Sequence, residues 1–146
     1  MYDVRPLALH HVGFVVADIA SAMEGFLCSL NASWDRQIWE DPLQRVKVAF
    51  LTTRLGEPQI ELVEPVGDRS PVRKFLVEKG GGLHRCCYET DDLGAELRTF
   101  RSRRAILVRP PQPAVAFDGR IAWVITQENL LVELLETGLA SPIAEN

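Results

Sequence analysis

The stretch LHHVGFVVADI at residues 9–19 is echoed by LHRCCYETDDL at residues 83–93. Both stretches open with Leu-His, and both carry an aspartate seven residues after their third position, Asp18 and Asp92. Two such copies predict an internal repeat. The copies differ at that third position, where His11 stands in the first and Arg85 in the second. The repeat decides the fold, and the exchange of an imidazole for a guanidinium decides the chemistry.

A helix is predicted directly after each copy, in the segments DIASAMEGFLCSL (18–30) and DLGAELRTFRSRR (92–104). Asp18 and Asp92 suit the N-cap, because a short carboxylate accepts hydrogen bonds from the first amides of a helix. Helical spacing places apolar residues on one face of each segment. These are Ile19, Met23, Phe26 and Leu27 in the first, and Leu93, Leu97 and Phe100 in the second.

Strand-like stretches follow each helix. They are RVKVAFLTT (45–53) and PQIELVEP (58–65) in the first half, and GRIAWVITQ (119–127) and NLLVELLE (129–136) in the second. The turn-rich segments RLGEP (54–58) and TQEN (126–129) predict hairpins between them. Each half therefore reads as a strand, a helix, and then two or three strands, which predicts an α+β fold of two paired βαβββ modules.

The modules are expected at about residues 7–66 and 83–137, within a single domain that spans residues 1–146. The joining segment, about residues 67–82, carries SPVRKFLVEKGGG at residues 70–82. It predicts a short helix in which Ser70 caps Pro71, because proline suits the first helical position. The triple glycine ends that helix.

Composition places the chain among soluble globular proteins. Its 146 residues are 47% hydrophobic and 25% charged, with a formal net charge of -4. This acidity argues against nucleic acid as a partner. No apolar run approaches the roughly 18 residues that cross a bilayer, which argues against a membrane partner. The start of the chain lacks the long apolar stretch of a signal peptide, so we expect a cytoplasmic protein.

Strand alternation predicts which side chains share a face of each first strand. His11, Gly13 and Val15 point to one side, and by the same register Arg85 lies with Cys87. His84 and Cys86 then point to the other side, and His10 has a structural or surface role. The three cysteines, at positions 28, 86 and 87, have no metal-binding spacing. We expect Cys86 and Cys87 to be small core or pocket-wall thiols.

Paired βαβββ modules, with a histidine in the first strand and a glutamate in the last, resemble the vicinal oxygen chelate superfamily. That superfamily includes glyoxalase I, extradiol dioxygenases and bleomycin resistance proteins. Within it, the chain is most similar to methylmalonyl-CoA epimerases. The similarity covers nearly the whole chain and is carried by HHVGFVVADIASAM, RVKVAFL, IELVEPVGDRSPVRKFLVEKGGGLH and LLVELLE. It implies an open, cup-shaped mixed sheet around one site, and a homodimer.

The resemblance also implies that four side chains, from the first and last strands of each module, hold a divalent cation. The matching positions are His11, Glu61, Arg85 and Glu133. Imidazole and carboxylate suit cobalt, manganese, nickel, zinc or magnesium. A guanidinium has no lone pair and keeps its proton, so Arg85 is no ligand. The implied metal set is reduced to His11, Glu61 and Glu133.

Two interpretations of Arg85 remain open. In one, the cation is absent and Arg85 pairs with Glu61 or Glu133. In the other, a metal stays on the three remaining ligands and Arg85 binds an anionic group of the substrate. Repulsion between a guanidinium and a divalent ion is on the order of several kcal/mol at an effective dielectric constant near 20, which favours the first interpretation.

The resemblance implies an enolate-type isomerisation of a small carboxylate or acyl compound. Without a cation, Arg85 can bind a substrate carboxylate, and Glu133 or Glu61 can act as the base. An isomerase, an epimerase and a glyoxalase-type lyase all stay open. The alternative is a non-catalytic, metal-free protein of the same superfamily that sequesters a small molecule. An iron dioxygenase is disfavoured, because two histidines and one carboxylate are not available at these positions.

Overall fold

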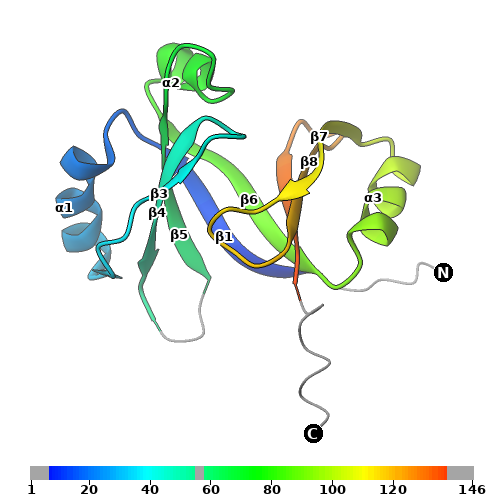
Figure 1. Cartoon of the computed structure of the whole chain (residues 1–146), viewed down its shortest axis with the longest axis horizontal. Coiled ribbons are helices and arrows are strands. Elements are labelled where there is room, and N and C mark those ends of the chain that lie inside the picture. The colour runs from blue at the N-terminus through cyan, green and yellow to red at the C-terminus, as the bar shows by residue number, and fades with distance from the viewer. Residues whose placement is uncertain (1–6, 55–57, 138–146) are drawn as a thin grey trace, which may run out of the picture. The chain divides into compact units, whose positions relative to one another are not determined.

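The structure is a computed structural model that describes residues 7–54 and 58–137. Within these ranges the chain forms nine strands and three helices (Figure 1). It divides into two compact units. The first unit comprises residues 11–85, and the second comprises residues up to 10 together with those from 86 onward.

The first unit holds the elements of the first repeat. They are β1 (Ala8–Val15, of which residues 11–15 lie in this unit), α1 (Ile19–Leu30), β2 (Ser33–Trp34), β3 (Trp39–Asp41), β4 (Val46–Thr52), β5 (Gln59–Pro65) and α2 (Arg73–Lys79). The strand order is β2-β4-β5-β1, and β3 also pairs with β4. The pairing of β1 with β5 is parallel, whereas β4 pairs with β2, β3 and β5 in antiparallel fashion.

The second unit repeats this plan. Its elements are β6 (Gly82–Thr90, of which residues 86–90 lie in this unit), α3 (Leu93–Ser102), β7 (Ile106–Pro113), β8 (Arg120–Ile125) and β9 (Leu131–Glu136). The strand order is β6-β9-β8-β7. Again the first and last strands pair in parallel, and the others are antiparallel. The predicted α+β class, with a mixed βαβββ arrangement in each repeat, is confirmed.

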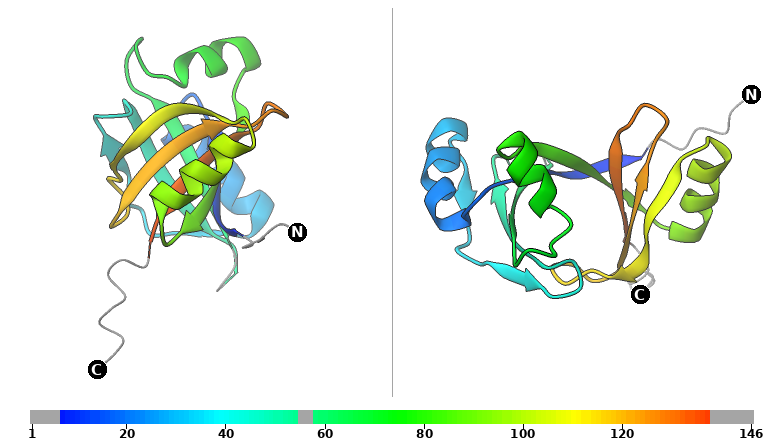
Figure 2. Two further views of the ribbon diagram at one scale, coloured as in Figure 1. Left: turned by 90° about the vertical axis from the view of Figure 1, so that its right-hand side faces the viewer. Right: turned by 90° about the horizontal axis from the view of Figure 1, so that it is seen from above.

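One helix covers one face of each sheet. The apolar face of α1 packs on Ala49, Leu51 and Leu62. The apolar face of α3 packs on a matching cluster of Ala122, Val124, Val132 and Leu134. Figure 2 shows α3 lying against the strands of its own unit in both views. All seven residues predicted for the two helical faces belong to these clusters, so those predictions are confirmed.

Both predicted N-caps are present. The Asp18 carboxylate accepts from the Ser21 amide at 2.8 Å, and the Asp92 carboxylate accepts from the Ala95 amide at 3.0 Å. Hydrogen bonds from the Ser21 hydroxyl and amide hold the pKa of Asp18 below its ordinary value. The aspartates therefore satisfy amides that the helix itself leaves without partners.

In each unit a second carboxylate accepts a hydrogen bond from the first amide of the helix. The sequence analysis did not predict these contacts. The Ile19 amide donates to Glu64 Oε1 at 2.8 Å, and the Leu93 amide donates to Glu136 Oε2 at 2.9 Å. Glu64 and Glu136 are the last residues of the repeated ELVE and ELLE motifs. Each repeat thus ties its last long strand to the start of its helix by the same bond.

The joining segment differs from the prediction in one detail. Its helix begins at Arg73, with Val72 at the N-cap and no side-chain cap, so the prediction that Ser70 caps Pro71 was wrong. The reason is a turn before the helix, in which the Ser70 carbonyl accepts from the Arg73 amide at 3.1 Å. In the triple glycine, Gly81 has φ +96°, and a Cβ there would lie 2.6 Å from the Val15 carbonyl oxygen. Only glycine fits that approach.

The hairpin predicted at TQEN joins β8 to β9, where the Thr126 amide donates to the Leu130 carbonyl at 3.0 Å. The hairpin predicted at RLGEP includes residues 55–57, which lie outside the described residues. The sequence did not single out the short strands β2 and β3 or the proline-bearing β7. Among the described residues, no helix is both long enough and apolar enough to cross a membrane.

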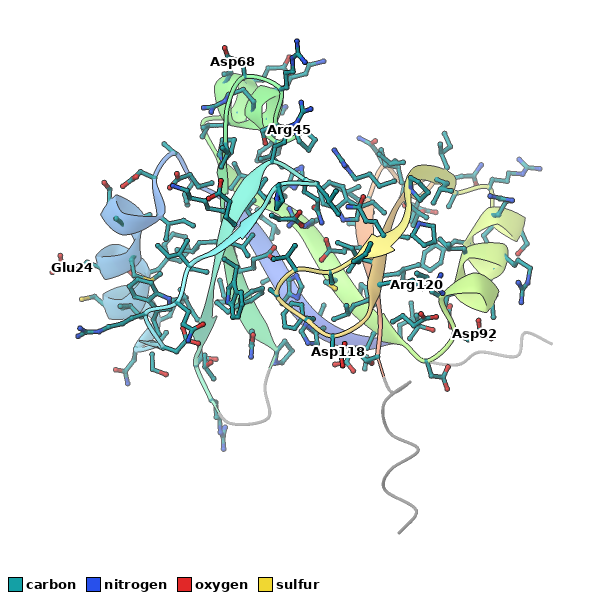
Figure 3. The ribbon with its side chains drawn as sticks, in the orientation of Figure 1. Glu24, Arg45, Asp68, Asp92, Asp118 and Arg120 are labelled. Carbon is teal, nitrogen blue, oxygen red and sulfur yellow. The ribbon has the colours of Figure 1, made fainter. Side chains whose placement is uncertain are left out.

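Replacing Glu136 by glutamine should lower the free energy of unfolding by about 1–2 kcal/mol at neutral pH, because a charged acceptor of hydrogen bonds is lost. The Arg120 guanidinium, at 3.0 Å, and the Leu93 amide hold the pKa of Glu136 below its ordinary range. Figure 3 labels Arg120 on β8. A lowered pKa adds stability above the ordinary carboxyl value of about 4.3, and this is lost as the pH falls through the lowered value.

Urea unfolding of the wild type and Glu136→Gln between pH 3 and 7 checks this prediction. The difference in unfolding free energy between the two proteins should begin to shrink below about pH 4, where the carboxyl of the unfolded chain becomes protonated, and should go on shrinking as the pH falls through the lowered pKa of the folded protein. Glu128→Gln, at an exposed position in the turn between β8 and β9, is the control and should change little at any pH. An equal difference at pH 3 and pH 7 would contradict the prediction.

Candidate functional site

The face of the first sheet opposite α1 carries the predicted site residues of that unit. Burial along β1 alternates, so that His11, Gly13 and Val15 are buried while the residues between them are half-buried. Gly13 lies opposite Glu61 in the parallel β1–β5 ladder. His11 and Glu61 are exposed by only 1% and 4%. The predicted strand register is therefore confirmed.

Arg85 binds Glu61 directly. Its Nη2 lies 2.8 Å from Glu61 Oε1, and Arg85 is only 3% exposed. The bond is short, charge-assisted and screened from water, so removing either partner would leave an uncompensated charge in the interior. Glu61 is one of the two carboxylates that the sequence offered to Arg85, and the structure places it against the guanidinium.

His11 completes the cluster without a short bond to Glu61. Its Nε2 lies 3.6 Å from Glu61 Oε1, which is beyond hydrogen-bonding range. The ring meets Phe50 edge to face, with 5.5 Å between the ring centroids. Phe50 lies opposite Glu61 in the antiparallel β4–β5 ladder, so both side chains leave the same face of the sheet. The oxygen Glu61 Oε1 is thus the centre of the cluster.

His84 is a partner of Arg85 that the sequence prediction missed. Arg85 Nη1 lies 3.3 Å from His84 Nδ1, and because a guanidinium only donates, this nitrogen is the acceptor. The His84 ring is held in turn by Phe75, at a centroid distance of 4.7 Å. The two ends of the guanidinium are therefore oriented separately, one by Glu61 and one by His84. His84 does not replace Arg85 on the buried face, as predicted.

Glu133 belongs to the second unit, where its partner is a tryptophan. Trp123 Nε1 donates to Glu133 Oε2 at 2.6 Å, and the two residues lie opposite each other in the β8–β9 ladder. Glu133 is 4% exposed and Trp123 is 3% exposed. Cys87, opposite Glu133 in the β6–β9 ladder, is a fully buried core thiol as predicted. The guanidinium carbon of Arg109 lies 5.3 Å from the Trp123 ring centroid.

The residues of the first unit do not fit a divalent cation. Arg85 Nη2 lies against Glu61 Oε1, which is also the oxygen 3.6 Å from His11 Nε2, so a metal shared by this imidazole and this oxygen would compete with the guanidinium. A metal near His11 and Glu61 would stand within a few ångströms of a permanent positive charge, which weakens binding strongly. This geometry favours the interpretation in which Arg85 takes the place of the cation.

A family model described as the Glyoxalase/Bleomycin resistance protein/Dioxygenase superfamily matches residues 10–123. The chain belongs to this superfamily. The ethylmalonyl-CoA/methylmalonyl-CoA epimerase of Cereibacter sphaeroides is 30% identical over 113 residues, which cover 77% of this chain and 82% of that protein. The uncharacterized protein YqjC of Bacillus subtilis is 31% identical over 130 residues, which cover 88% of this chain and 91% of that protein.

The fold is shared with the crystal structure of methylmalonyl-CoA epimerase from Mycobacterium tuberculosis. The TM-score is 0.82 at 26% sequence identity, and the match covers 98% of this chain and 97% of the other. These findings confirm the resemblance to epimerases within the glyoxalase superfamily that the repeat and its motifs predicted.

Arg85→Met should lower the free energy of unfolding by about 3–5 kcal/mol, because it leaves the Glu61 carboxylate buried without its cation. The double variant Arg85→Met/Glu61→Met should lose much less than the sum of the two single variants, since it buries no lone charge. Denaturant unfolding of all four proteins gives the coupling energy. Simple additivity would show that the two side chains do not interact.

Gly13→Ala should also lower stability, by about 1–3 kcal/mol, through crowding of the ion pair. A Cβ at Gly13 would lie 3.0 Å from Glu61 Oε1 and 3.2 Å from Arg85 Cγ. The matched control is Gly25→Ala in α1, where a Cβ meets nothing within 4 Å. That change should instead raise stability by up to about 1 kcal/mol, because alanine favours a helix. Equal effects of the two substitutions in thermal unfolding would argue against crowding.

Proposed function

We propose that the protein is an epimerase-like isomerase that moves a proton at the carbon between the two carbonyl groups of a small acyl thioester bearing a carboxylate. Two kinds of observation support this. The similar proteins of Cereibacter sphaeroides and Mycobacterium tuberculosis are named as epimerases of such thioesters. The chain also carries buried carboxylates and a buried guanidinium, which are the groups that proton transfer beside a carboxylate requires.

The proposed reaction begins when a carboxylate takes the proton from the carbon. The electron pair of the broken C–H bond moves toward the thioester carbonyl and gives an enolate. A proton returned to the opposite face of that carbon restores the carbonyl and inverts the centre. Nothing is oxidised or reduced, and no further reactant is consumed. The protein must supply a base, an acid and positive charge near the enolate.

Glu133 and Glu61 are the proposed proton-transfer groups, and Arg85 is the proposed substrate-binding cation. Glu61 Oε1 is engaged by Arg85 at 2.8 Å, whereas Glu133 Oε2 is held by the neutral Trp123 indole. Glu133 is the proposed base, because the indole N–H orients its carboxylate without competing for the proton that moves. A substrate carboxylate that takes over the donors of Arg85 would release Glu61 to exchange a proton.

The proposal does not use a metal. Arg85 supplies a fixed positive charge where the resemblance implies a cation held by His11, Glu61 and Glu133. Its planar guanidinium can bind a carboxylate through two parallel hydrogen bonds, which a point charge cannot do. The support for this is the direct contact of Arg85 with Glu61.

A second candidate function is favoured by the same contact. The Arg85–Glu61 pair already satisfies both charges in a buried setting, which is what a site without chemistry would also do. The alternative is a metal-free protein that sequesters a small molecule.

We also propose that the protein is a cytoplasmic homodimer that binds a small molecule and binds neither nucleic acid nor membrane. Composition and resemblance support this proposal.

Incubation with methylmalonyl-CoA in deuterated water tests the proposal, with mass spectrometry as the readout. The wild type should introduce deuterium at the carbon between the carbonyls without added metal and in the presence of a chelator. Glu133→Gln should slow this exchange by about 10²–10⁴-fold, since a general base is removed. Glu24→Gln, on the exposed side of α1 labelled in Figure 3, should leave exchange unchanged.

Arg85→His is the complementary variant. It places an imidazole at the one of the four implied metal-ligand positions that carries an arginine. The affinity of this variant for cobalt or zinc should therefore exceed that of the wild type by orders of magnitude. Calorimetric titration measures the difference. Exchange by the wild type that a chelator abolishes would contradict the metal-free mechanism. Absence of exchange together with tight binding of methylmalonyl-CoA would favour the sequestering protein.

A further inference from the structure

We propose that Trp123 is a positioning residue for Glu133, and that its indole N–H fixes this carboxylate in the orientation from which it exchanges a proton with substrate. The inference rests on the proposed function and names a group that the reaction would need beyond the two glutamates and the arginine. It follows from three observations on the second unit: a short hydrogen bond, a cation above the indole ring, and a distorted strand that brings this cation there.

The hydrogen bond is the first observation. At 2.6 Å between Trp123 Nε1 and Glu133 Oε2, it is at the short end for an N–H donor on a carboxylate. Both side chains are nearly fully buried, and they face each other across the β8–β9 ladder. A buried carboxylate without a donor would be very costly. The indole therefore fixes the rotamer of Glu133 and supports its charged form.

The choice of tryptophan matters for proton transfer. An indole N–H donates and cannot accept, and it does not give up its proton in the physiological range. Trp123 can therefore hold Glu133 without taking or supplying the proton that moves in the reaction. A histidine or tyrosine at this position could exchange protons with the carboxylate. The partner of Glu133 is thus a positioning group and not a second acid.

Arg109 lies over the face of that indole. Its guanidinium carbon is 5.3 Å from the ring centroid, within the range of a cation–π interaction. The cation draws electron density from the ring, which strengthens the N–H as a donor. Arg109 and Trp123 are opposite each other in the β7–β8 ladder. Glu133, Trp123 and Arg109 therefore form one row across three neighbouring strands.

The backbone of β7 is irregular on both sides of Arg109. The register shifts between Leu107 and Arg109, and again between Arg109 and Gln112. Such irregularities redirect a side chain relative to a regular strand. Pro110 and Pro111 follow at once and give the ladder no N–H donors. The strand is thus interrupted where it presents the guanidinium to the Trp123 ring.

Trp123→Phe tests the proposal, because it keeps a buried aromatic ring and removes the donor. The exchange rate with saturating methylmalonyl-CoA should fall by about 10²-fold, as expected for a misplaced reacting group. The dissociation constant for methylmalonyl-CoA should stay within about 2-fold of the wild-type value, since the indole does not bind substrate. The matched control is Trp34→Phe, which removes an indole donor to the Gln37 carbonyl in the other unit. It should leave the exchange rate unchanged.

Arg109→Met removes the cation over the Trp123 ring and so tests the row of Glu133, Trp123 and Arg109. Because Arg109 is half-exposed, this change should disturb folding less than a change at a buried residue. It should lower the saturating exchange rate, and Arg109→Lys should largely restore it. A readout independent of activity is the set of indole ¹H–¹⁵N cross-peaks. Of the three tryptophans, the cross-peak of Trp123 should shift strongly upfield in Glu133→Gln, and that of Trp34 should not move.

The outcomes separate the two proposals. Absence of exchange in the wild type would sink the proposed function, and with it any catalytic role of Glu133. An active wild type together with a fully active Trp123→Phe would overturn the positioning role alone. A loss that appears only as weaker binding of methylmalonyl-CoA would also overturn it, because the indole would then act on the substrate. An indole cross-peak of Trp123 that ignores Glu133→Gln would show that the hydrogen bond is not made in solution.

Discussion

The Arg85 guanidinium, which keeps its proton, contacts the buried Glu61 carboxylate. Several neighbouring residues of the first unit are arranged around that contact. Removing Arg85 and Glu61 from water costs several kcal/mol for each ion, and only close approach repays this. The 2.8 Å bond provides the approach, His84 orients the other end of the guanidinium, and Gly13 leaves room where any Cβ would crowd the pair. His11, which resembles a metal ligand, faces an oxygen already engaged by a cation.

The internal repeat shows which parts of the architecture tolerate change. In both copies the last glutamate of the repeated motif holds a helix start, Glu64 on Ile19 and Glu136 on Leu93. The first glutamate of the motif has different partners, a guanidinium for Glu61 and an indole for Glu133. The bond that fixes helix to strand is therefore common to both copies, whereas the buried face opposite the helix has diverged. The two glutamates at matching positions of the repeat therefore accept from different donors.

Local rules predicted most of the fold. Period-two alternation placed Arg85 rather than His84 on the buried face, and short carboxylates marked both helix starts. The helix start at Arg73 was missed because a turn, and not a side-chain cap, sets it. Strand β7 was missed because its prolines remove ladder donors, which only an edge strand tolerates. The partner of Glu133 could have been found, since the hairpin centred on TQEN pairs positions 123 and 133. The contact of Arg85 with Glu61 could not, because it depends on packing between strands far apart in sequence.

A fixed guanidinium and a bound divalent ion are different solutions to one electrostatic problem. A metal must be acquired, competes with protons for its ligands and can be removed, whereas Arg85 is always present and always charged. The arginine has a cost, since it engages Glu61 before any substrate arrives. In the proposed function, a substrate carboxylate would relieve that cost by offering the guanidinium a second pair of acceptors, so that substrate binding and the release of Glu61 would be one event. This coupling ties the proposed chemistry to anionic substrates, because a neutral ligand has no charge with which to displace Glu61.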